Sequence, residues 1–217
     1  MATKKSYTEA EMMDDFGLTR LKNQTTPLMA QWLNAPDAVL LPHQAIIFDE
    51  ILEEAQVSIE GWNEEELKMG FISPLLLITG LKTTDKYRVF YERILTATIE
   101  NKPLSVKVDY MIATGILDLF KNPYFYFQEY KPQRRPSGDS MGQLLQAMLI
   151  AQAKNNNDKP IYGCEIMGKD WNFVVLEGKT YCISKSYDCT ERDELLKIMA
   201  ILRHFKHILE TVLLVDI

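Results

Sequence analysis

This sequence of 217 residues has few cysteines, no excess of basic residues and no long hydrophobic run. Its three cysteines show no Cys-x-x-Cys spacing, which argues against a zinc ribbon or a disulfide framework and fits a reduced compartment. The longest apolar run, around residues 74–78, is far shorter than the about 18 residues of a membrane span. No apolar stretch follows the two lysines near the N-terminus, so no secretory signal is evident. We expect a cytoplasmic protein with no membrane partner.

Positive charge is outweighed by negative charge, with 24 lysines and arginines against 30 aspartates and glutamates. Non-specific coating of nucleic acid depends on neutralised phosphates, so this composition argues against it and requires any DNA-binding surface to be local. The chain is otherwise 47% hydrophobic and 25% charged, which is typical of a globular protein with a substantial core.

Two common catalytic motifs are missing. The sequence contains neither the Gly-x-x-x-x-Gly-Lys-Ser/Thr phosphate loop nor the Gly-x-Ser-x-Gly nucleophile elbow. A nucleotide-driven motor is therefore not indicated. His204 and His207 have a helical spacing that can hold a metal, but no third ligand is evident and we expect both to be exposed.

The first half of the chain is expected to be largely helical. The polar first 20 residues predict a frayed or accessory N-terminus. Apolar residues recur at helical spacing over 28–59, with two breaks at prolines, and predict two or more helices. Asn63, followed by three glutamates, predicts the start of another helix that runs to about Gly80, with Glu66 completing the cap.

The second half switches to period-two alternation. Residues 87–100 and 104–113 predict a β-hairpin, and the aromatic run at 124–131 predicts a third strand inside the sheet. A helix over about 141–154 follows, then strands at 161–167, 172–176 and 180–184, and an amphipathic helix from about Glu191 whose apolar stripe includes Val212. We therefore predict one α/β domain, a mixed central sheet flanked by helices, with a partly flexible helical extension over residues 1–60.

Charged residues end the third predicted strand. Glu129 and Lys131 are two residues apart and therefore share a face. On the preceding strand, the apolar even-numbered residues 106–112 are expected on one face, which places Asp109 on the other face beside Glu129. Two carboxylates suit Mg²⁺, and a lysine beside them could orient water or offset charge on a phosphate. The pattern indicates phosphodiester hydrolysis; the alternative is an ordinary ion pair at a strand end.

The order Asp109, then Glu129-Tyr130-Lys131 on the next strand, then a helix carrying Gln143, resembles the PD-(D/E)XK nuclease superfamily. The resemblance covers roughly residues 62–209 and includes an acidic first helix after Trp62. It implies a restriction-endonuclease-like fold over 61–217, with Asp109 and Glu129 as ligands of Mg²⁺ or Mn²⁺ and Lys131 as the catalytic lysine. Val108 replaces the proline of the family's name.

Two further site residues carry alternatives. The resemblance implies that Gln143 supports the site, but Ser140-Met-Gly-Gln143 is equally a capping box, and Gln146 one turn on could substitute. Glu64 shares a helical face with the apolar stripe and is the candidate for an additional acid, although acids at a helix start are usually solvated.

DNA is the expected partner of this protein. Arg134 and Arg135, just past the proposed site, suit phosphate contacts, and the alternative for each is a solvated loop. The leading function is a Mg²⁺-dependent nuclease acting on DNA. The alternative is an inactive nuclease-fold protein that binds nucleic acid or protein, because a fold does not establish activity. The N-terminal helices are the expected surface for a homodimer or a partner protein.

Overall fold

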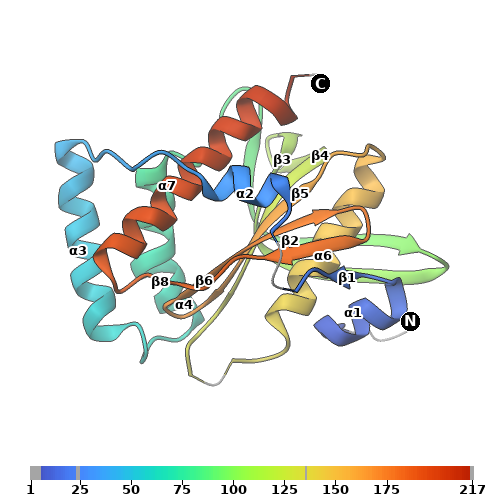
Figure 1. Cartoon of the computed structure of the whole chain (residues 1–217), viewed down its shortest axis with the longest axis horizontal. Coiled ribbons are helices and arrows are strands. Elements are labelled where there is room, and N and C mark those ends of the chain that lie inside the picture. The colour runs from blue at the N-terminus through green and yellow to red at the C-terminus, as the bar shows by residue number, and fades with distance from the viewer. Residues whose placement is uncertain (1–5, 23–24, 135, 216–217) are drawn as a thin grey trace.

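The computed structural model describes residues 6–22, 25–134 and 136–215, and within them an eight-stranded mixed sheet carries helices on both faces (Figure 1). The strand order is β1-β7-β6-β5-β4-β3-β2, with β8 paired to β6. The strands are β1 (Thr19–Arg20), β2 (Arg88–Ile99), β3 (Lys102–Ile116), β4 (Leu119–Lys131), β5 (Ile161–Met167), β6 (Asp170–Glu177), β7 (Thr180–Ile183) and β8 (Tyr187–Asp188). This architecture confirms the predicted fold class.

The helices lie between and after the strands. They are α1 (Glu9–Phe16), α2 (Pro27–Leu33), α3 (Pro42–Ser58), α4 (Glu64–Leu67), the π-turn η1 (Lys68–Ile72), α5 (Ser73–Thr79), α6 (Ser140–Asn155), α7 (Arg192–Ile208) and the π-turn η2 (Leu209–Leu213). Strands β2, β3 and β4 form an antiparallel meander, whereas β4 and β5 are parallel. A parallel pair needs a crossover connection, and α6 provides it.

Two apolar clusters occupy the two faces of the sheet. Helices α2, α3, α5 and α7 pack on one face, and α1 and α6 pack on the other, as Figure 1 shows. Trp32 of α2 anchors the first cluster, because its ring meets those of Tyr162 and Phe173 edge-on at 5.1 Å. Its indole Nε1 donates to the carbonyl oxygen of Ile201 in α7 at 3.0 Å, so the buried N–H is satisfied.

The N-terminal segment packs against the core, which differs from the expectation of a frayed start. Helix α1 begins with a capping box between Thr8 and Glu11 and buries Met12 and Phe16 against α6. A side chain on Gly142 of α6 would clash with the backbone of residues 7 and 8, so the close approach requires glycine there. Strand β1 then pairs in parallel with β7. The domain boundary at residue 60 stays a prediction.

The helix after Asn63 starts as predicted, with Asn63 and Glu66 forming the capping box and Gly80 ending α5 in a left-handed conformation. The predicted apolar stripe of the last helix is wrong at its end, where Val212 is exposed and Leu213 is buried instead. The π-helical segment η2 widens the helix there and shifts the buried side by one residue. Within the described residues, no helix is long and apolar enough to span a membrane.

Candidate active site

The end of β4 presents different chemistry on its two faces. On one face, Gln128 Nε2 donates to the Tyr126 hydroxyl at 2.8 Å, and the Tyr130 hydroxyl donates to Gln128 Oε1 at 2.9 Å. These buried polar groups satisfy one another within the aromatic core. Because strand residues alternate, Glu129 and Lys131 point to the opposite face, toward α6.

Asp109 of β3 reaches the same place through the backbone of β4. The last pair between β3 and β4 is Tyr110 opposite Gln128. Among the described residues, β3 has no residue paired with β4 after Gln128. Two residues further along β4, the N–H of Tyr130 donates to Asp109 Oδ2 at 2.9 Å. The side chain thus takes the position of a backbone acceptor, which occupies one carboxylate oxygen of Asp109 beside Glu129.

The predicted face assignment on β3 is wrong in part. Val106 and Val108 pack with α6, whereas Tyr110 and Ile112 pack in the cluster on the other face. The alternation therefore shifts by one residue close to Asp109. The opposing strand β2 shifts at the same level, where Glu92 has a left-handed φ of 55°. Irregularities of this kind re-aim side chains next to functional sites.

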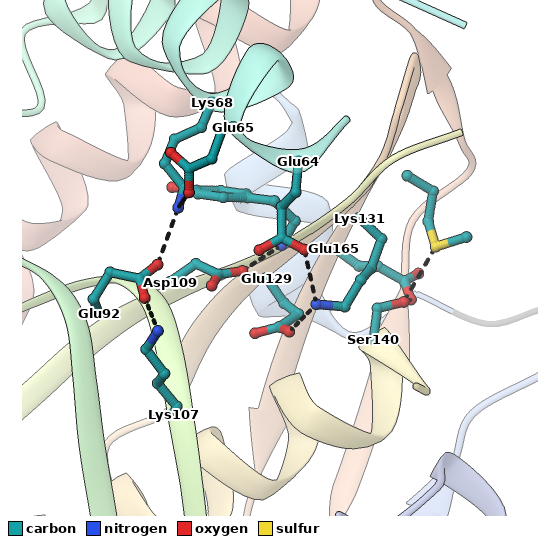
Figure 2. Close-up of polar contacts among 12 residues, drawn as sticks. Glu64, Glu65, Lys68, Glu92, Lys107, Asp109, Glu129, Lys131, Ser140 and Glu165 are labelled. Atoms are coloured by element: carbon teal, nitrogen blue, oxygen red, sulfur yellow. Dashed lines mark hydrogen bonds and ion pairs between the residues drawn. The ribbon is translucent and has the colours of Figure 1, made fainter. Parts of the chain in front are cut away.

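Lys131 bridges two acids from different elements, as Figure 2 shows. Its Nζ lies 3.0 Å from Glu129 Oε1 and 3.6 Å from Glu64 Oε2, which descends from the first turn of α4. The side chains of Glu129 and Lys131 are 3% and 7% exposed, whereas that of Glu64 is 36% exposed. The structure thus brings Asp109, Glu129, Lys131 and Glu64 together; below, these four residues are called the acid cluster.

Burial dominates the electrostatics of the acid cluster. It raises the pKa of Glu129 to about 8, with the neighbouring Asp109 adding to the effect and Lys131 opposing it. Burial also raises the pKa of Asp109, although the Tyr130 N–H and Lys131 counter it. Burial alone would lower the pKa of Lys131, but Glu129 and Glu64 outweigh it and the pKa is raised. The site is therefore short of positive charge.

A second group of charges lies beside the first, also drawn in Figure 2. Glu92 accepts from Lys68 Nζ at 3.0 Å and pairs closely with Lys107, and Lys68 also contacts Glu65 at 3.1 Å. Burial would raise the pKa of Glu92, but the hydrogen bonds from Lys107 and Lys68 lower it below its ordinary value. We call these four residues the lysine cluster.

The start of α6 differs from its predicted cap. Asp139 is the N-cap, and its side chain accepts from the N–H of Gly142 at 2.7 Å, so the proposed Ser140–Gln143 capping box is wrong. Ser140 instead donates to Glu165 of β5. Gln143 is half-buried in the first turn and makes no side-chain hydrogen bond to the acid cluster among the described residues.

Gln146 does not take that place either. It is fully buried, and its Nε2 donates to the carbonyl oxygen of Ser105 at 3.0 Å. Its Oε1 has no hydrogen-bond partner among the described residues. Supporting roles for Gln143 or Gln146 stay predictions.

Arg134 lies past the end of β4 at an open cavity. Its side chain is 72% exposed and forms an ion pair with Glu60 at 3.4 Å, which is a weak interaction between two exposed groups. The cavity, of about 700 Å³, is also lined by Trp62 and Lys169. Arg135 lies outside the described residues. A second cavity, of about 480 Å³, is lined by Ser140 and Glu165. Neither cavity is lined by Asp109, Glu129 or Lys131.

The acid cluster does not form a complete metal cage. Among the described residues, no group of three or more histidine, cysteine, aspartate or glutamate side chains is arranged to hold a metal ion. The donors available to a cation are the carboxylates of Asp109 and Glu129, with Glu64 nearby. His207 is exposed as predicted, but His204 is half-buried, with its Nδ1 2.9 Å from the carbonyl oxygen of Trp32.

Sequence reasoning missed Glu92 and Glu165. Glu165 is in register with Glu129 on the parallel strand β5, and this pairing cannot be inferred without the crossover geometry. Glu92 did leave a signal. The apolar residues Phe90 and Leu95 both face α6, yet they are five positions apart, and this odd spacing breaks the period of two.

No protein-family model and no curated protein matches the chain. Among solved structures, one chain of "cryoEM structure DrdV-DNA complex" aligns with a TM-score of 0.40 and 14% sequence identity. The alignment covers 74% of this chain and 14% of that chain, so this chain spans a small part of the length of the DrdV chain that it matches.

Proposed function

We propose that this protein is a metal-dependent nuclease that hydrolyses phosphodiester bonds of DNA at the acid cluster. The observation that carries the proposal is the meeting of Asp109, Glu129 and Lys131, which come from neighbouring strands and share one buried position. The same residues carry the sequence resemblance to PD-(D/E)XK nucleases, which supports the assignment.

The charge balance of the acid cluster supports a resident divalent cation. Glu129 has a pKa of about 8, because burial and the adjacent Asp109 disfavour its ionised form. A cation held by these two carboxylates would stabilise the ionised form of Glu129. Mg²⁺ is suited to such a partial set, since it usually keeps several waters and takes only one or two protein carboxylates plus substrate phosphate. When bound, the ion would supply Lewis-acid stabilisation and a more acidic water.

The chain's own residues would divide the remaining work. Asp109 accepts the Tyr130 N–H through one oxygen, and the other, which has no hydrogen bond among the described residues, would face a ligand. Lys131, released from Glu129, would offset negative charge on the phosphate or orient the attacking water. Glu64, on α4, would help to hold Lys131 in place. Arg134 is exposed at the neighbouring cavity, where it would contact a phosphate of the substrate backbone.

The direct test is cleavage of supercoiled, linear, single-stranded and branched DNA, and of RNA, with Mg²⁺ or Mn²⁺. We expect wild-type protein to cleave DNA, and Lys131→Ala or Asp109→Asn to lose at least about 100-fold of that activity. Lys179→Ala is the matched control, because Lys179 also forms an ion pair, with Glu100 at 2.9 Å, but lies outside the acid cluster.

Equal cleavage by wild-type protein and Lys131→Ala would contradict the proposed role of the lysine. Binding of DNA without cleavage by any of the proteins would favour the alternative, a nuclease fold that serves as a nucleic-acid-binding module.

A further inference from the structure

We infer that Glu92, on the edge strand β2, is a positioning residue that turns Asp109 toward Glu129. The inference rests on the proposed function, because the direction of Asp109 matters for catalysis only if the two carboxylates act together. Glu92 itself would touch neither the cation nor the substrate. It acts through the backbone of β2 and β3 and through its two lysine contacts.

Glu92 on β2 lies opposite Asp109 on the paired strand β3. The pairs Tyr91–Tyr110 and Arg93–Val108 flank this position in the antiparallel register. Glu92 has φ of 55°, which is uncommon for a residue with a side chain. No turn explains it, since the residue lies in the middle of a strand.

The face of the sheet to which the β3 side chains point changes opposite Glu92. On β3, Val106 and Val108 face α6, so regular alternation would send Asp109 to the opposite face, away from Glu129. Beyond the irregularity, Met111 faces α6, although it is three residues from Val108. The shift in alternation therefore allows Asp109 to share a face with Glu129 and to accept the Tyr130 N–H.

The carboxylate of Glu92 fixes this local geometry to two other elements. Lys68 joins it to the helical segment that follows α4, and Lys107 joins it to β3, two residues before Asp109. The side chain of Lys68 is only 13% exposed, so its contact with Glu92 is partly shielded from solvent. Because Glu64 is one turn before Lys68, the same helical segment contacts both clusters (Figure 2).

The test separates the backbone of Glu92 from its charge. Glu92→Gly retains access to a left-handed backbone but removes the carboxylate, whereas Glu92→Val removes both, because a β-branched residue disfavours positive φ. Glu100 provides matched controls. Glu100 has φ of 52° and an ion pair with Lys179. It lies in the hairpin turn after β2, at the end of the strand that is far from the acid cluster. Glu100→Gly and Glu100→Val therefore report the cost of the substitution alone.

Three readouts are needed, and the first two do not depend on activity. Amide hydrogen exchange of Tyr130 in the metal-free protein reports whether Asp109 still accepts its N–H. The dissociation constant of Mn²⁺ reports the carboxylate pair, and DNA cleavage reports the reaction. For Glu92→Val we expect about 10-fold faster exchange of Tyr130, and about 10- to 100-fold losses in Mn²⁺ affinity and in cleavage. Glu92→Gly should show smaller changes of the same sign, and the Glu100 variants none.

Wild-type values of all three readouts in a folded Glu92→Val protein would overturn the inference. If that variant does not fold, Glu92→Ala, which opposes positive φ less strongly, replaces it with the same expected ranking below Glu92→Gly. A wild-type protein that neither binds Mn²⁺ nor cleaves DNA would overturn the proposed function instead. The exchange rate of Tyr130 would then still decide whether Glu92 orients Asp109.

Discussion

Two adjacent charge clusters in this protein have opposite balances. The lysine cluster sets two lysines against two glutamates near the surface, and its central Glu92 has a lowered pKa. The acid cluster sets one lysine against three carboxylates, and its central Glu129 has a pKa raised to about 8 because it is buried and lies beside Asp109. The pKa of a glutamate is thus shifted in opposite directions on β2 and β4, the two strands that flank β3.

The comparison shows that the acid cluster lacks positive charge and the lysine cluster does not. In the lysine cluster each charge has an opposite partner on the protein, so the group is electrically complete and suited to fixing structure. In the acid cluster a single ammonium contacts Glu129 and Glu64, and among the described residues Asp109 accepts a hydrogen bond only from a backbone N–H. Buried like charges that are this poorly compensated are more typical of functional sites than of structural ion pairs.

The largest expected effect comes from removing the single cation of the acid cluster. Lys131→Ala should lower the free energy of unfolding by about 3 kcal/mol at pH 10, where Glu129 is ionised, because the substitution leaves a buried carboxylate without its partner. The loss should be smaller at pH 5, where Glu129 can take up a proton. Urea unfolding at both pH values measures this. Lys107→Ala is the control; this lysine is 56% exposed and should cost less than about 1 kcal/mol.

A smaller effect follows from the titration of Glu129. Its folded pKa of about 8 exceeds its ordinary 4.5, so its contribution to stability is complete below pH 4.5 and is lost as the pH rises through 8. Metal-free protein should lose at most about 1.4 kcal/mol per pH unit from this group. Glu129→Gln should flatten this part of the pH profile, whereas Glu60→Gln at an exposed position should not. An unchanged slope in Glu129→Gln would assign the effect to another group.

The smallest effect should have the opposite sign with pH. Glu92 has a lowered pKa, so its contribution is present above its ordinary 4.5 and is lost as the pH falls through the lower folded value. Glu92→Gln should therefore be less stable than wild-type protein at pH 7, by less than about 1 kcal/mol because the group is partly exposed. The difference should fade in acid. Chemical unfolding at pH 7 and pH 3 tests this, and a larger deficit in acid would contradict the comparison.

Much of the fold was predictable from local patterns. Hydrophobic patterns correctly indicated the helices from α2 onward and the strands β2 to β7. Elements that bury one side show their period in the sequence, and the buried half of β4 shows as a continuous aromatic run. The Asn63–Glu66 cap was also predictable, since its two partners are three residues apart. The sharing of a face by Glu129 and Lys131 follows from the same local geometry.

Features that depend on distant contacts could not be predicted. The docking of α1 requires Gly142, more than a hundred residues away, and α1 itself has only eight residues, of which Met12 and Phe16 are buried. Asp139 competes successfully with Ser140 for the cap because Ser140 is drawn to Glu165 on another strand. The left-handed backbone at Glu92 is not marked by its residue type, because such a conformation is usually associated with glycine or asparagine.

The sequence by itself determined which residues could form a hydrolytic site, because residue type and spacing set the chemistry and the side of each strand. Only the tertiary structure decided that Asp109 faces Glu129, since this depends on a shift in alternation shared by two paired strands. It also decided how far these acids are buried, and therefore the direction of their pKa values. Burial and register are properties of the packed sheet, and neither is encoded within a single stretch of chain.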